Sequence, residues 1–341
     1  MSDAVIDGIP FVFVRRGAVV ESVHRVAACA ADVRGAVVYS AGDIDAPVYL
    51  RSAAKPFIAA EIVACGAAAR FGFGARELAT VAASHNGEPE HVAVVRDILE
   101  RIGLTPDALQ CGVHPPSYEP AAAALAEAGR RPTALHHNCS GKHAGILAAC
   151  VHLGADPATY LSPEHPVQRR ILAFCGRMLG IEAGGLPVGV DGCGIPVFAA
   201  PLRAAAVAFA RLATLDGLSA GDAAALATVR DAMAAEPFYV AGTGRFDTAL
   251  MVATGGRIVC KAGAEGVHGD ALRRERLGFV LKAVDGGAGR AVPPAATAML
   301  ESLGALDSAE RADLEPFAAP PLRNVAGRVV GRLETRAPAR A

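Results

Sequence analysis

Hydrophobic positions near the start of the 341-residue chain follow the pattern of paired strands. Phe11–Val14 and Ala18–Val26 are rich in β-branched and aromatic residues, and the stretch between them contains Gly17. This combination predicts a β-hairpin. A short apolar segment at Ala36–Tyr39 predicts one further strand.

The middle of the chain changes to apolar residues at helical spacing, and most of these segments end just before a glycine. Ser219 is placed to cap one of them, and the alanine-rich run Pro120–Ala128 is more typical of a helix than of a linker. The other predicted helices are Pro56–Cys65, Glu90–Ile102, Gly141–Leu153, Pro166–Leu179 and Leu218–Ala235.

Strand character returns near the C-terminus, at Arg257–Lys261, Leu277–Val284 and Val325–Leu333. The order is therefore strands, then mostly helices, then strands, without the alternation that is typical of a parallel doubly wound sheet. We expect an α+β fold in which one antiparallel sheet is built from the N-terminal and C-terminal strands. Helices would pack on this sheet, and the middle of the chain would form a helical portion.

A hydrophobic content of 52% is enough to bury a large core. We expect the whole chain, 1–341, to act as a single catalytic unit. Its sheet portion would include roughly 1–50 and 245–335, and roughly 51–240 would be mostly helical.

Charge and cysteine usage exclude several classes of partner. The formal net charge is −1, so no strong field would recruit nucleic acid or an anionic membrane surface. No apolar run is long enough to span a membrane, and the N-terminus carries Asp3 and Asp7 but no basic region typical of a secretory signal. The eight cysteines show no paired spacing, which is typical of reduced thiols. We therefore expect a cytoplasmic protein.

Lysine is scarce in this chain. Lysine and arginine total 33, yet the only lysines are Lys55, Lys142, Lys261 and Lys282. A desolvated lysine can lose its proton and act as a base or a metal ligand, whereas arginine stays charged. Three of the four lysines lie in motifs that contain glycine or serine, so these motifs are candidates for chemistry.

The first of these motifs joins Ser52 to Lys55. Residues three apart share one face of a helix, and Pro56 is tolerated only near a helix start, so both side chains would lie in the first turn. Backbone N–H groups there favour an oxyanion, and a neutral lysine amine can remove the serine proton. The alternative is a helix-capping serine beside a solvated lysine.

Two further motifs follow in order. Ser84-His85-Asn86 offers a second serine, and Lys261-Ala262-Gly263 follows a predicted strand. The order S-x-x-K, S-x-N, K-x-G is similar to that of the penicillin-binding proteins and class A β-lactamases. The second serine could relay a proton to the leaving amine, and the strand lysine would raise the local positive potential. A simple turn and an edge-strand lysine are the structural alternatives.

Cysteines and a lysine form the other candidate cluster. Cys139 and Lys142 would share a helix face, and Cys193 lies in a glycine-rich loop with Asp191. Two thiolates, a nitrogen donor and a water would satisfy a four-coordinate zinc ion, although lysine is a rare ligand. The alternative is two buried thiols with a salt bridge between Lys142 and Asp191. A phosphate-binding loop is excluded, because the upstream glycine is missing and His143 replaces the required serine or threonine.

Taken together, five motifs spread over the chain resemble those of the asparaginase II family, the rhizobial-type, class 3 L-asparaginases. They are Arg51–Pro56, Ser84–Glu88, His137–His143, Asp191–Gly194 and Lys261–Gly266.

The resemblance implies a fold like that of serine β-lactamases and glutaminases, a homodimer, and one zinc ion per subunit beside the active site. It implies two Ser-Lys pairs, Ser52 with Lys55 and Ser84 with Lys261. Zinc ligands would be the side chains of Cys139, Lys142 and Cys193 with a water as the fourth.

One departure from the family pattern is visible. Where some members carry a further active-site cysteine, this chain offers Asp247. That leaves the role of the position open.

The resemblance also implies that Asp191 lies behind the metal ligands and holds the water or the substrate.

The resulting hypothesis is an L-asparaginase that releases L-aspartate and ammonia. Ser52 would attack the side-chain amide after Lys55 removes its proton, and Arg51, His143 and Asp191 would bind the substrate's α-groups. A second possibility is another amidase of this fold, acting on glutamine, a peptide or a β-lactam. A third is a non-catalytic zinc-binding protein with a degenerate site. A fourth is an unrelated enzyme with a purely structural metal site.

Overall fold

The computed structural model describes residues 6–336, and within them the chain forms two compact units. The first, here called the sheet unit, comprises the chain up to Ala53, Ala200–Thr214 and the chain from Ala249 onward. The second, the helical unit, comprises Ala54–Ala199 and Leu215–Thr248. Residues 200–214 therefore belong with the sheet, although they lie inside the stretch predicted to be mostly helical.

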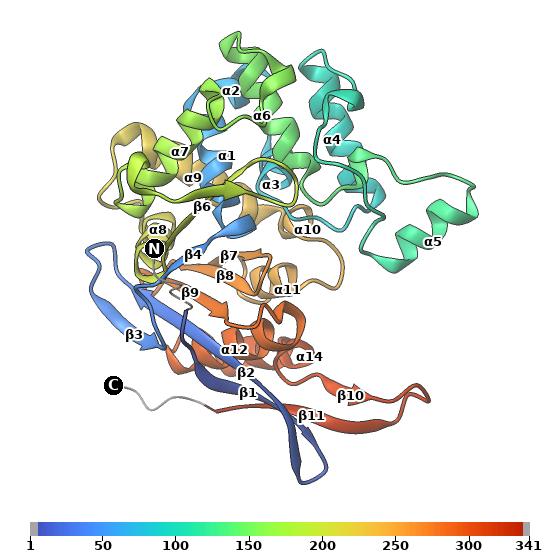
Figure 1. Ribbon diagram of the computed structural model, residues 1–341, viewed down its shortest axis with the longest axis vertical. Helices are drawn as coiled ribbons and strands as arrows, with labels where there is room; N and C mark the ends of the chain where they lie inside the picture. The colour runs from blue at the N-terminus through green and yellow to red at the C-terminus, as the bar shows by residue number, and fades with distance from the viewer. Residues whose placement is uncertain (1–5, 337–341) are drawn as a thin grey trace. The chain divides into compact units, whose positions relative to one another are not determined.

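The sheet unit contains one eight-stranded antiparallel sheet within the described residues, in the order β10-β11-β1-β2-β9-β8-β7, with β3 also paired to β2. The N-terminal hairpin lies in its middle, between strands from the C-terminal part of the chain (Figure 1). The predicted α+β fold, with its sheet built from both ends, is confirmed. The strands are β1 (Ile9–Arg16), β2 (Val19–Ala31), β3 (Val37–Ala41), β7 (Ile258–Gly263), β8 (Val267–Leu272), β9 (Leu277–Ala283), β10 (Pro321–Arg323) and β11 (Val329–Thr335).

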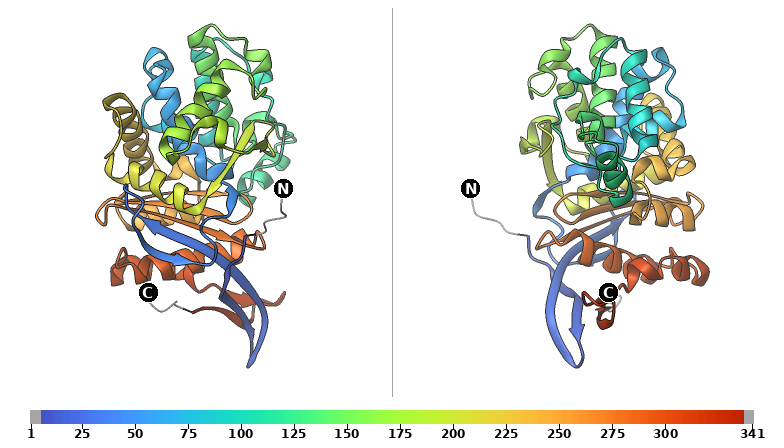
Figure 2. Two further views of the ribbon diagram at one scale, coloured as in Figure 1. Left: turned by 60° about the vertical axis from the view of Figure 1, so that its left-hand side comes forward. Right: turned by 90° about the vertical axis from the view of Figure 1, so that its right-hand side faces the viewer.

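Helices cover both faces of this sheet (Figure 2). On one face α8 (Leu202–Thr214) packs against β8, β9 and β2, and on the other α12 (Ala288–Ser302) crosses the strands. Glycines let α8 approach closely. A β-carbon at Gly278 would overlap the Ala206 carbonyl oxygen, and one at Gly269 would overlap the ring of Phe209. The short helices α13 (Ser308–Asp313) and α14 (Glu315–Ala318) follow α12.

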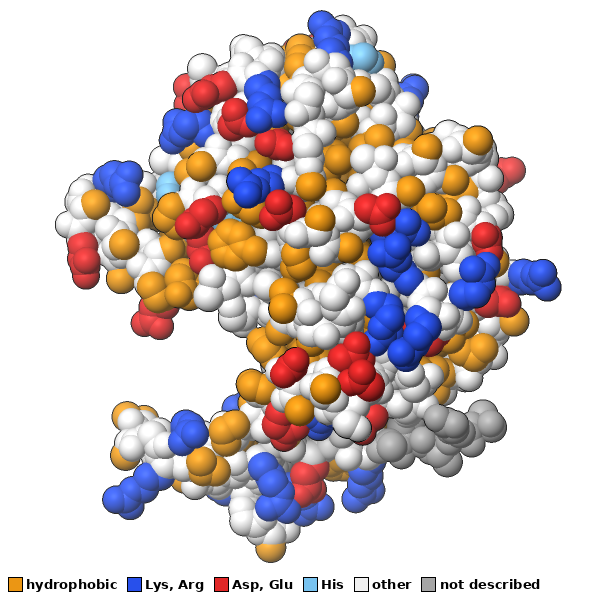
Figure 3. Space-filling view, turned by 180° about the vertical axis from the view of Figure 1, so that it is seen from behind, with side chains coloured by type: hydrophobic (Ala, Val, Ile, Leu, Met, Phe, Trp, Pro, Cys, Tyr) orange, Lys and Arg blue, Asp and Glu red, His pale blue; other side chains and the backbone are white. Residues whose placement is uncertain are grey.

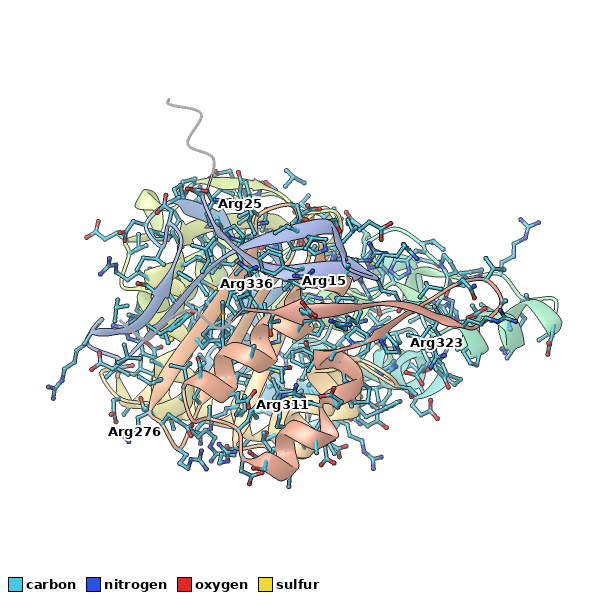
Figure 4. The ribbon with its side chains drawn as sticks, turned by 90° about the horizontal axis from the view of Figure 1, so that it is seen from below. Arg15, Arg25, Arg276, Arg311, Arg323 and Arg336 are labelled. Atoms are coloured by element: carbon cyan, nitrogen blue, oxygen red, sulfur yellow. The ribbon has the colours of Figure 1, made fainter. Side chains whose placement is uncertain are left out.

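Cross-strand contacts fix the register of the outer hairpins. Arg15 Nε donates to Glu334 at 2.5 Å across β1 and β11, and the Arg336 guanidinium lies 4.5 Å from the ring centre of Phe13. Figure 4 shows Arg15 and Arg336 along these two strands, and Arg323 on β10 beyond them. Such pairs each stabilise a sheet by a fraction of a kcal/mol, so they select the register more than they hold the fold.

The helical unit is organised around α1 and α6, which are buried along most of their length. Figure 1 shows the other helices of this unit around them. The elements are α1 (Lys55–Ala64), α2 (Ala67–Arg70), α3 (Ala75–Val81), α4 (Pro89–Arg101), α5 (Glu119–Glu127), α6 (Ser140–Leu153), α7 (Pro166–Leu179), α9 (Ala220–Ala235), α10 (Pro237–Val240) and the paired strands β5 (Val188–Val190) and β6 (Pro196–Pro201).

Small residues on α6 bring it close to α3. A β-carbon at Gly141 would overlap the carbonyl oxygen of Thr80, and one at Gly145 would lie 2.6 Å from Val81 Cγ1. The two glycines are four residues apart, so they share one face of α6. This close approach sets the start of α6 beside the loop that follows α3, where two of the predicted motifs meet.

The predicted elements agree with the structure except at particular segments. The predicted helices are present with ends shifted by at most two residues, and Ser219 caps α9 by accepting from Asp222 N. The strand predicted to begin at Val325 begins at Val329 instead, because Asn324 and Gly327 close a turn there. The sequence did not predict α8, α12 or β8, nor several shorter elements such as α3 and β10.

Charged side chains of both signs are interspersed over the face shown in Figure 3. This mixture agrees with the formal net charge of −1. Among residues 6–336, no helix combines the length and the apolar character that crossing a membrane requires.

Candidate functional site

Lys55 and Ser84 meet inside the helical unit. Lys55 opens α1 and is 1% exposed, and Ser84 lies just after α3. Lys55 Nζ lies 3.0 Å from Ser84 Oγ, 3.2 Å from Cys139 Sγ, and in contact with the carbonyl oxygen of Ala83. A lysine this deeply buried is rare unless its amine is paired or used in chemistry.

The surroundings of Lys55 favour the neutral amine. Burial lowers its pKa most strongly, Cys139 raises it, and the nearby Lys142 lowers it again, with a net decrease. A neutral amine has two N–H bonds and one lone pair. If the N–H bonds go to the Ala83 carbonyl and the Cys139 sulfur, the lone pair is left to accept the proton of a serine hydroxyl. The arrangement is that of a base beside a serine.

The turn that carries Ser84 is held by a second loop of the helical unit. Glu88 is buried and accepts from Thr243 N at 2.8 Å and from Thr243 Oγ1 at 2.7 Å. Asn86 Nδ2 donates to the Thr243 carbonyl oxygen at 2.9 Å. Gly242 has φ +110°, and a β-carbon there would lie 2.5 Å from Glu88 Oε1. Only glycine allows the loop to come this close in this conformation.

His85 fastens the same turn to the start of α6. Ser140 Oγ donates to the Leu135 carbonyl oxygen at 2.9 Å, so it accepts from His85 Nε2, also at 2.9 Å. His85 Nδ1 in turn accepts from Gly87 N. Burial, followed by the charges of His91 and Lys55, holds the pKa of His85 well below its ordinary value. His85 is therefore a neutral connector, and it fixes Ser84 relative to Cys139.

The structure brings together Cys139, Lys142 and Cys193, the three residues expected to hold a metal ion. Lys142 Nζ donates to Cys193 Sγ at 3.0 Å, and the Cys193 thiol donates to the Cys139 sulfur. Cys193 Sγ also lies 3.9 Å from Asp191 Oδ2. The alternative of a direct salt bridge from Lys142 to Asp191 is replaced by the bond from Lys142 to sulfur.

The protons in this cluster are unevenly shared. The hydrogen bond from Cys193 holds the pKa of Cys139 well below its ordinary value, and that same bond raises the pKa of Cys193. Burial lowers the pKa of Lys142, but the sulfurs of Cys139 and Cys193 outweigh it and the net pKa is raised. These directions favour loss of the proton from Cys139 and its retention on Cys193 and Lys142.

This donor set fits a thiophilic metal ion. Two sulfur donors and one nitrogen donor converge in a buried place, and each hydrogen bond between them joins two atoms that could bind one ion. Soft thiolate donors with nitrogen favour zinc over magnesium or calcium. Binding would require the Cys193 and Lys142 protons to leave.

Two predicted substrate-binding residues border this cluster. His143 follows Lys142 on α6, and its Nδ1 accepts from the Tyr160 hydroxyl at 2.7 Å, since that hydroxyl oxygen accepts from Gln110 N. The Nε2 of His143 has no hydrogen-bond partner among residues 6–336. A buried N–H without a partner is available to a water or a substrate. Asp191 lies in the loop after β5, where Gly192 N donates to its carboxylate at 2.8 Å.

The remaining predicted residues belong to the sheet unit. Ser52 lies in the 3₁₀ turn η1 (Arg51–Ala54), so it precedes the α-helix rather than forming its first turn. Arg51 has φ +50°, a left-handed conformation that a side chain makes costly. Gly263 packs against this turn, since a β-carbon there would lie 2.8 Å from Leu50 O and 3.2 Å from Ala53 N. The strand end that carries Lys261 therefore borders the turn that carries Ser52.

Lys261 itself is buried on β7, and its Nζ donates to the Ala262 carbonyl oxygen at 2.7 Å. Asp247, the position that departs from the family pattern, lies in α11 (Phe246–Ala253). The predicted pairing of Ser52 with Lys55 and of Ser84 with Lys261 stays a prediction. Inside the helical unit, the base nearest to Ser84 is Lys55.

Sequence reasoning treated the serine–lysine motifs and the cysteine–lysine cluster as separate. The structure joins them, because the Lys55 amine contacts both Ser84 and Cys139. Sequence reasoning also missed the support that Glu88 and Thr243 give to the Ser84 turn. The available signal was the Gly242-Thr243-Gly244 run, whose two glycines allow a tight loop.

Comparison with known proteins gives one match over nearly the whole chain. Residues 12–335 match the family model described as L-asparaginase II. No curated protein matches the chain. Among solved structures, the chain is similar to a β-lactamase from Mycobacterium bovis at 15% identity, covering 82% of this chain and 94% of that one with a TM-score of 0.41. It is also similar to a protein named Mglu in its native form, at 18% identity, covering 83% and 66% of the two chains with a TM-score of 0.39.

Proposed function

The chain belongs to the L-asparaginase II family, and from this premise we propose that it hydrolyses the side-chain amide of L-asparagine to L-aspartate and ammonia. The broader activity of an amidohydrolase follows from the family. We propose three further points: asparagine as the substrate, serine–lysine chemistry and a bound metal ion.

One observation carries the proposal beyond the family. Lys55 is buried, its pKa is lowered chiefly by burial, and its amine lies 3.0 Å from Ser84 Oγ. A neutral amine beside a serine hydroxyl is what nucleophilic amide cleavage requires near neutral pH. Arginine, the usual cation of this chain, would stay charged and could not accept the proton.

We propose that Ser52 is the nucleophile. Its Oγ bonds to the amide carbon of asparagine while its proton passes to Lys55, three residues on. The carbonyl oxygen becomes an oxyanion, which backbone N–H groups at the η1 turn would stabilise. Ser84 and Lys55 then return a proton to the amide nitrogen, the C–N bond breaks and ammonia leaves. Water hydrolyses the aspartyl ester and restores the Ser52 hydroxyl.

Lys261 would act through its charge. Its place on β7, beside the turn of Ser52, supports a role in raising the local positive potential, which favours a neutral Lys55 and a carboxylate substrate. Arg51 and Asp191 would bind the α-carboxylate and the α-ammonium of the substrate. The Nε2–H of His143, which lacks a partner within 6–336, would donate to the carboxylate or to an ordered water.

We propose one zinc ion per subunit, held by Cys139, Lys142 and Cys193, with a water as the fourth ligand. When bound, it would supply a fixed positive charge that orients the substrate. Lys55, whose amine lies 3.2 Å from Cys139 Sγ, would then share a sulfur neighbour with the ion, which favours its neutral form.

We also propose a homodimer in the cytoplasm. The eight cysteines all lie within the described residues and are free thiols, which supports a reducing compartment.

Sedimentation of the purified chain would test the dimer, and a monomer at micromolar concentration would contradict it.

Ammonia release from L-asparagine and L-glutamine, together with nitrocefin hydrolysis, tests the function. We expect kcat/KM for asparagine to exceed that for glutamine by about a hundredfold, the scale on which a pocket separates substrates that differ by one methylene. Nitrocefin should not be turned over. Preferred glutamine or nitrocefin cleavage would leave the fold and the family intact but would contradict the substrate proposed here.

A further inference from the structure

A hollow of about 430 Å³ lies between α4 and α5 in the helical unit, apart from the residues of the proposed chemistry. Figure 1 shows α5 in the long segment that connects α4 to α6. One face of α4, with Pro89, Val92, Ala93 and Arg96, forms one wall, because these positions follow helical spacing. The opposite wall comes from α5. The full lining is Gly87, Pro89, Val92, Ala93, Arg96, Pro116, Ala121, Ala124, Leu125, Arg130, Arg131, Thr133 and His136.

Three arginines line this hollow, and no acidic residue does. Most other arginines of the unit pair with carboxylates; Arg177, for example, forms two 2.9 Å bonds to Asp222. Within residues 6–336, Arg96, Arg130 and Arg131 have no ion pair or side-chain hydrogen bond. Like charges without a counter-charge repel each other, so a bound anion would lower the electrostatic free energy of this cluster.

His136 adds a hydrogen-bond donor, and its pKa responds to the charges of the nearby arginines. Its Nδ1 accepts from Thr133 N at 3.0 Å, so in the neutral ring the proton is on Nε2. Burial, then the charges of Arg130 and Arg96, lower the pKa of His136, which places both arginines close to the ring. The positive charge of the hollow therefore comes from the arginines, and His136 contributes a neutral N–H.

Apart from Thr133, the rest of the lining is apolar, and the hollow is larger than an inorganic ion needs. At roughly 30 Å³ for each water-sized group, the volume accommodates on the order of ten to fifteen such groups. Valine, leucine, proline and alanine side chains supply most of the walls. With no carboxylate in the lining, a zwitterionic amino acid would leave its ammonium unpaired.

We propose that this hollow binds a small organic anion with an apolar body and no ammonium group, its head a carboxylate or a phosphate monoester. The head would bind to the arginines, which match planar and tetrahedral oxyanions, and the body would bury against Val92 and Leu125.

The site touches both segments that carry the candidate chemistry. Gly87 lies three residues after Ser84, and His136 three residues before Cys139. A β-carbon at Gly87 would lie 2.8 Å from the carbonyl oxygen of His136, so the two segments meet at the wall of the hollow. A bound anion would therefore contact both.

Calorimetric titration of the full chain with phenyl phosphate and with hexanoate tests the proposal. We expect at least one of them to bind at one site per chain, about tenfold or more tighter than inorganic phosphate, which has a head but no body. The tighter of the two identifies the head group. Failure of both to saturate at millimolar concentration, or equal binding of inorganic phosphate, would overturn the proposal.

Variants locate the binding and do not depend on amidase activity. Arg96→Gln and Arg130→Gln should each weaken binding about tenfold, since each removes a charge-assisted bond at an exposed position where folding is unaffected. Ala124→Phe should also weaken it by filling the hollow while keeping every charge. Arg169→Gln, at an exposed arginine outside the hollow, is the matched control. Unchanged affinity in R96Q, R130Q and A124F alike would place the ligand elsewhere and refute the site.

Discussion

At the scale of single residues, the environment of each lysine decides what it can do. Lys55 and Lys142 are both buried and both contact sulfur, yet the pKa of Lys55 is lowered and that of Lys142 is raised. The difference lies in their partners, because Lys142 bonds to the Cys193 sulfur and has the Asp191 carboxylate nearby, whereas Lys55 contacts one sulfur and neutral oxygens and is opposed by the charge of Lys142. Lys55 is thereby suited to accept a proton, whereas Lys142 keeps its proton until a metal ion displaces it.

Replacing Lys55 should remove the base. We expect Lys55→Met, which keeps the volume without a proton acceptor, to lower kcat by about a thousandfold with the fold retained. Lys55→Arg should lose as much, because guanidinium stays protonated. Lys282→Arg, at a lysine outside the proposed chemistry, should keep activity. Ammonia release with thermal unfolding as a folding check gives the answer, and near-normal turnover by either Lys55 variant would end its role as base.

The lowered pKa of Lys55 also predicts a pH dependence. The amine accepts a proton only when neutral, so kcat/KM should rise with pH through the pKa of Lys55 and level off above it. Because burial places that pKa below the ordinary lysine range, the rise should occur below pH 10.5. A rate profile that is flat throughout, or that falls as pH rises, would be inconsistent with a lysine base.

Metal binding should be linked to proton release. Cys193 and Lys142 both have raised pKa values, which favours keeping their protons without the ion, whereas the pKa of Cys139 is lowered. Zinc must displace about two protons, so its apparent affinity should rise by up to about a hundredfold for each pH unit near neutrality. Competition with a chelator at two pH values measures this. A pH-independent affinity would exclude this ligand set.

At the scale of elements, hydrophobic spacing and glycines located most of the helical unit. The helices α4, α6 and α7 were found because each has apolar residues at helical spacing and a glycine at its end. The helix α12 was missed because Pro293 and Pro294 lie in its interior, and α8 was missed because it follows β6 directly with no turn between them. The strand β8 was missed because it is buried throughout and does not alternate. Which face of a helix meets which neighbour could not be predicted from spacing alone.

Close packing of α8 on the sheet gives a stability prediction. Gly278→Ala should destabilise the protein by about 2–4 kcal/mol, because the added methyl overlaps backbone atoms of α8, which cannot rotate away. Gly289→Ala is the control, since nothing lies within 4 Å of a β-carbon there and alanine favours a helix. Urea unfolding of both variants measures the difference. Equal stability of the two would show that α8 does not approach the sheet this closely.

The loop that holds the Ser84 turn gives a second element-scale prediction. Thr243→Val removes the hydroxyl that donates to the buried Glu88 carboxylate, which should cost about 1–3 kcal/mol of stability and lower kcat. Thr243→Ser keeps the hydroxyl and should restore most of both. A valine variant with wild-type kcat would mean that this loop does not position Ser84.

At the scale of the whole molecule, the motifs are divided between the two units. Ser52 and Lys261 belong to the sheet unit, and Lys55, Ser84 and the metal cluster to the helical unit, with the chain passing from one unit to the other between Ser52 and Lys55. The sequence alone was enough to locate the motifs and their order. The meeting of Lys55 with Cys139 could not, because it depends on how α6 packs against α3 through Gly141 and Gly145.

A serine of this chain should form an aspartyl ester during turnover of asparagine. Rapid acid quenching followed by peptide mass spectrometry tests it directly, with Ser52→Ala and Ser84→Ala as matched variants. We predict one aspartyl group per chain on Ser52, absent from Ser52→Ala and accumulating in variants slow to deacylate. An adduct on Ser84 would exchange the roles of the two serines. An adduct on a cysteine, or full activity in both alanine variants, would contradict the account.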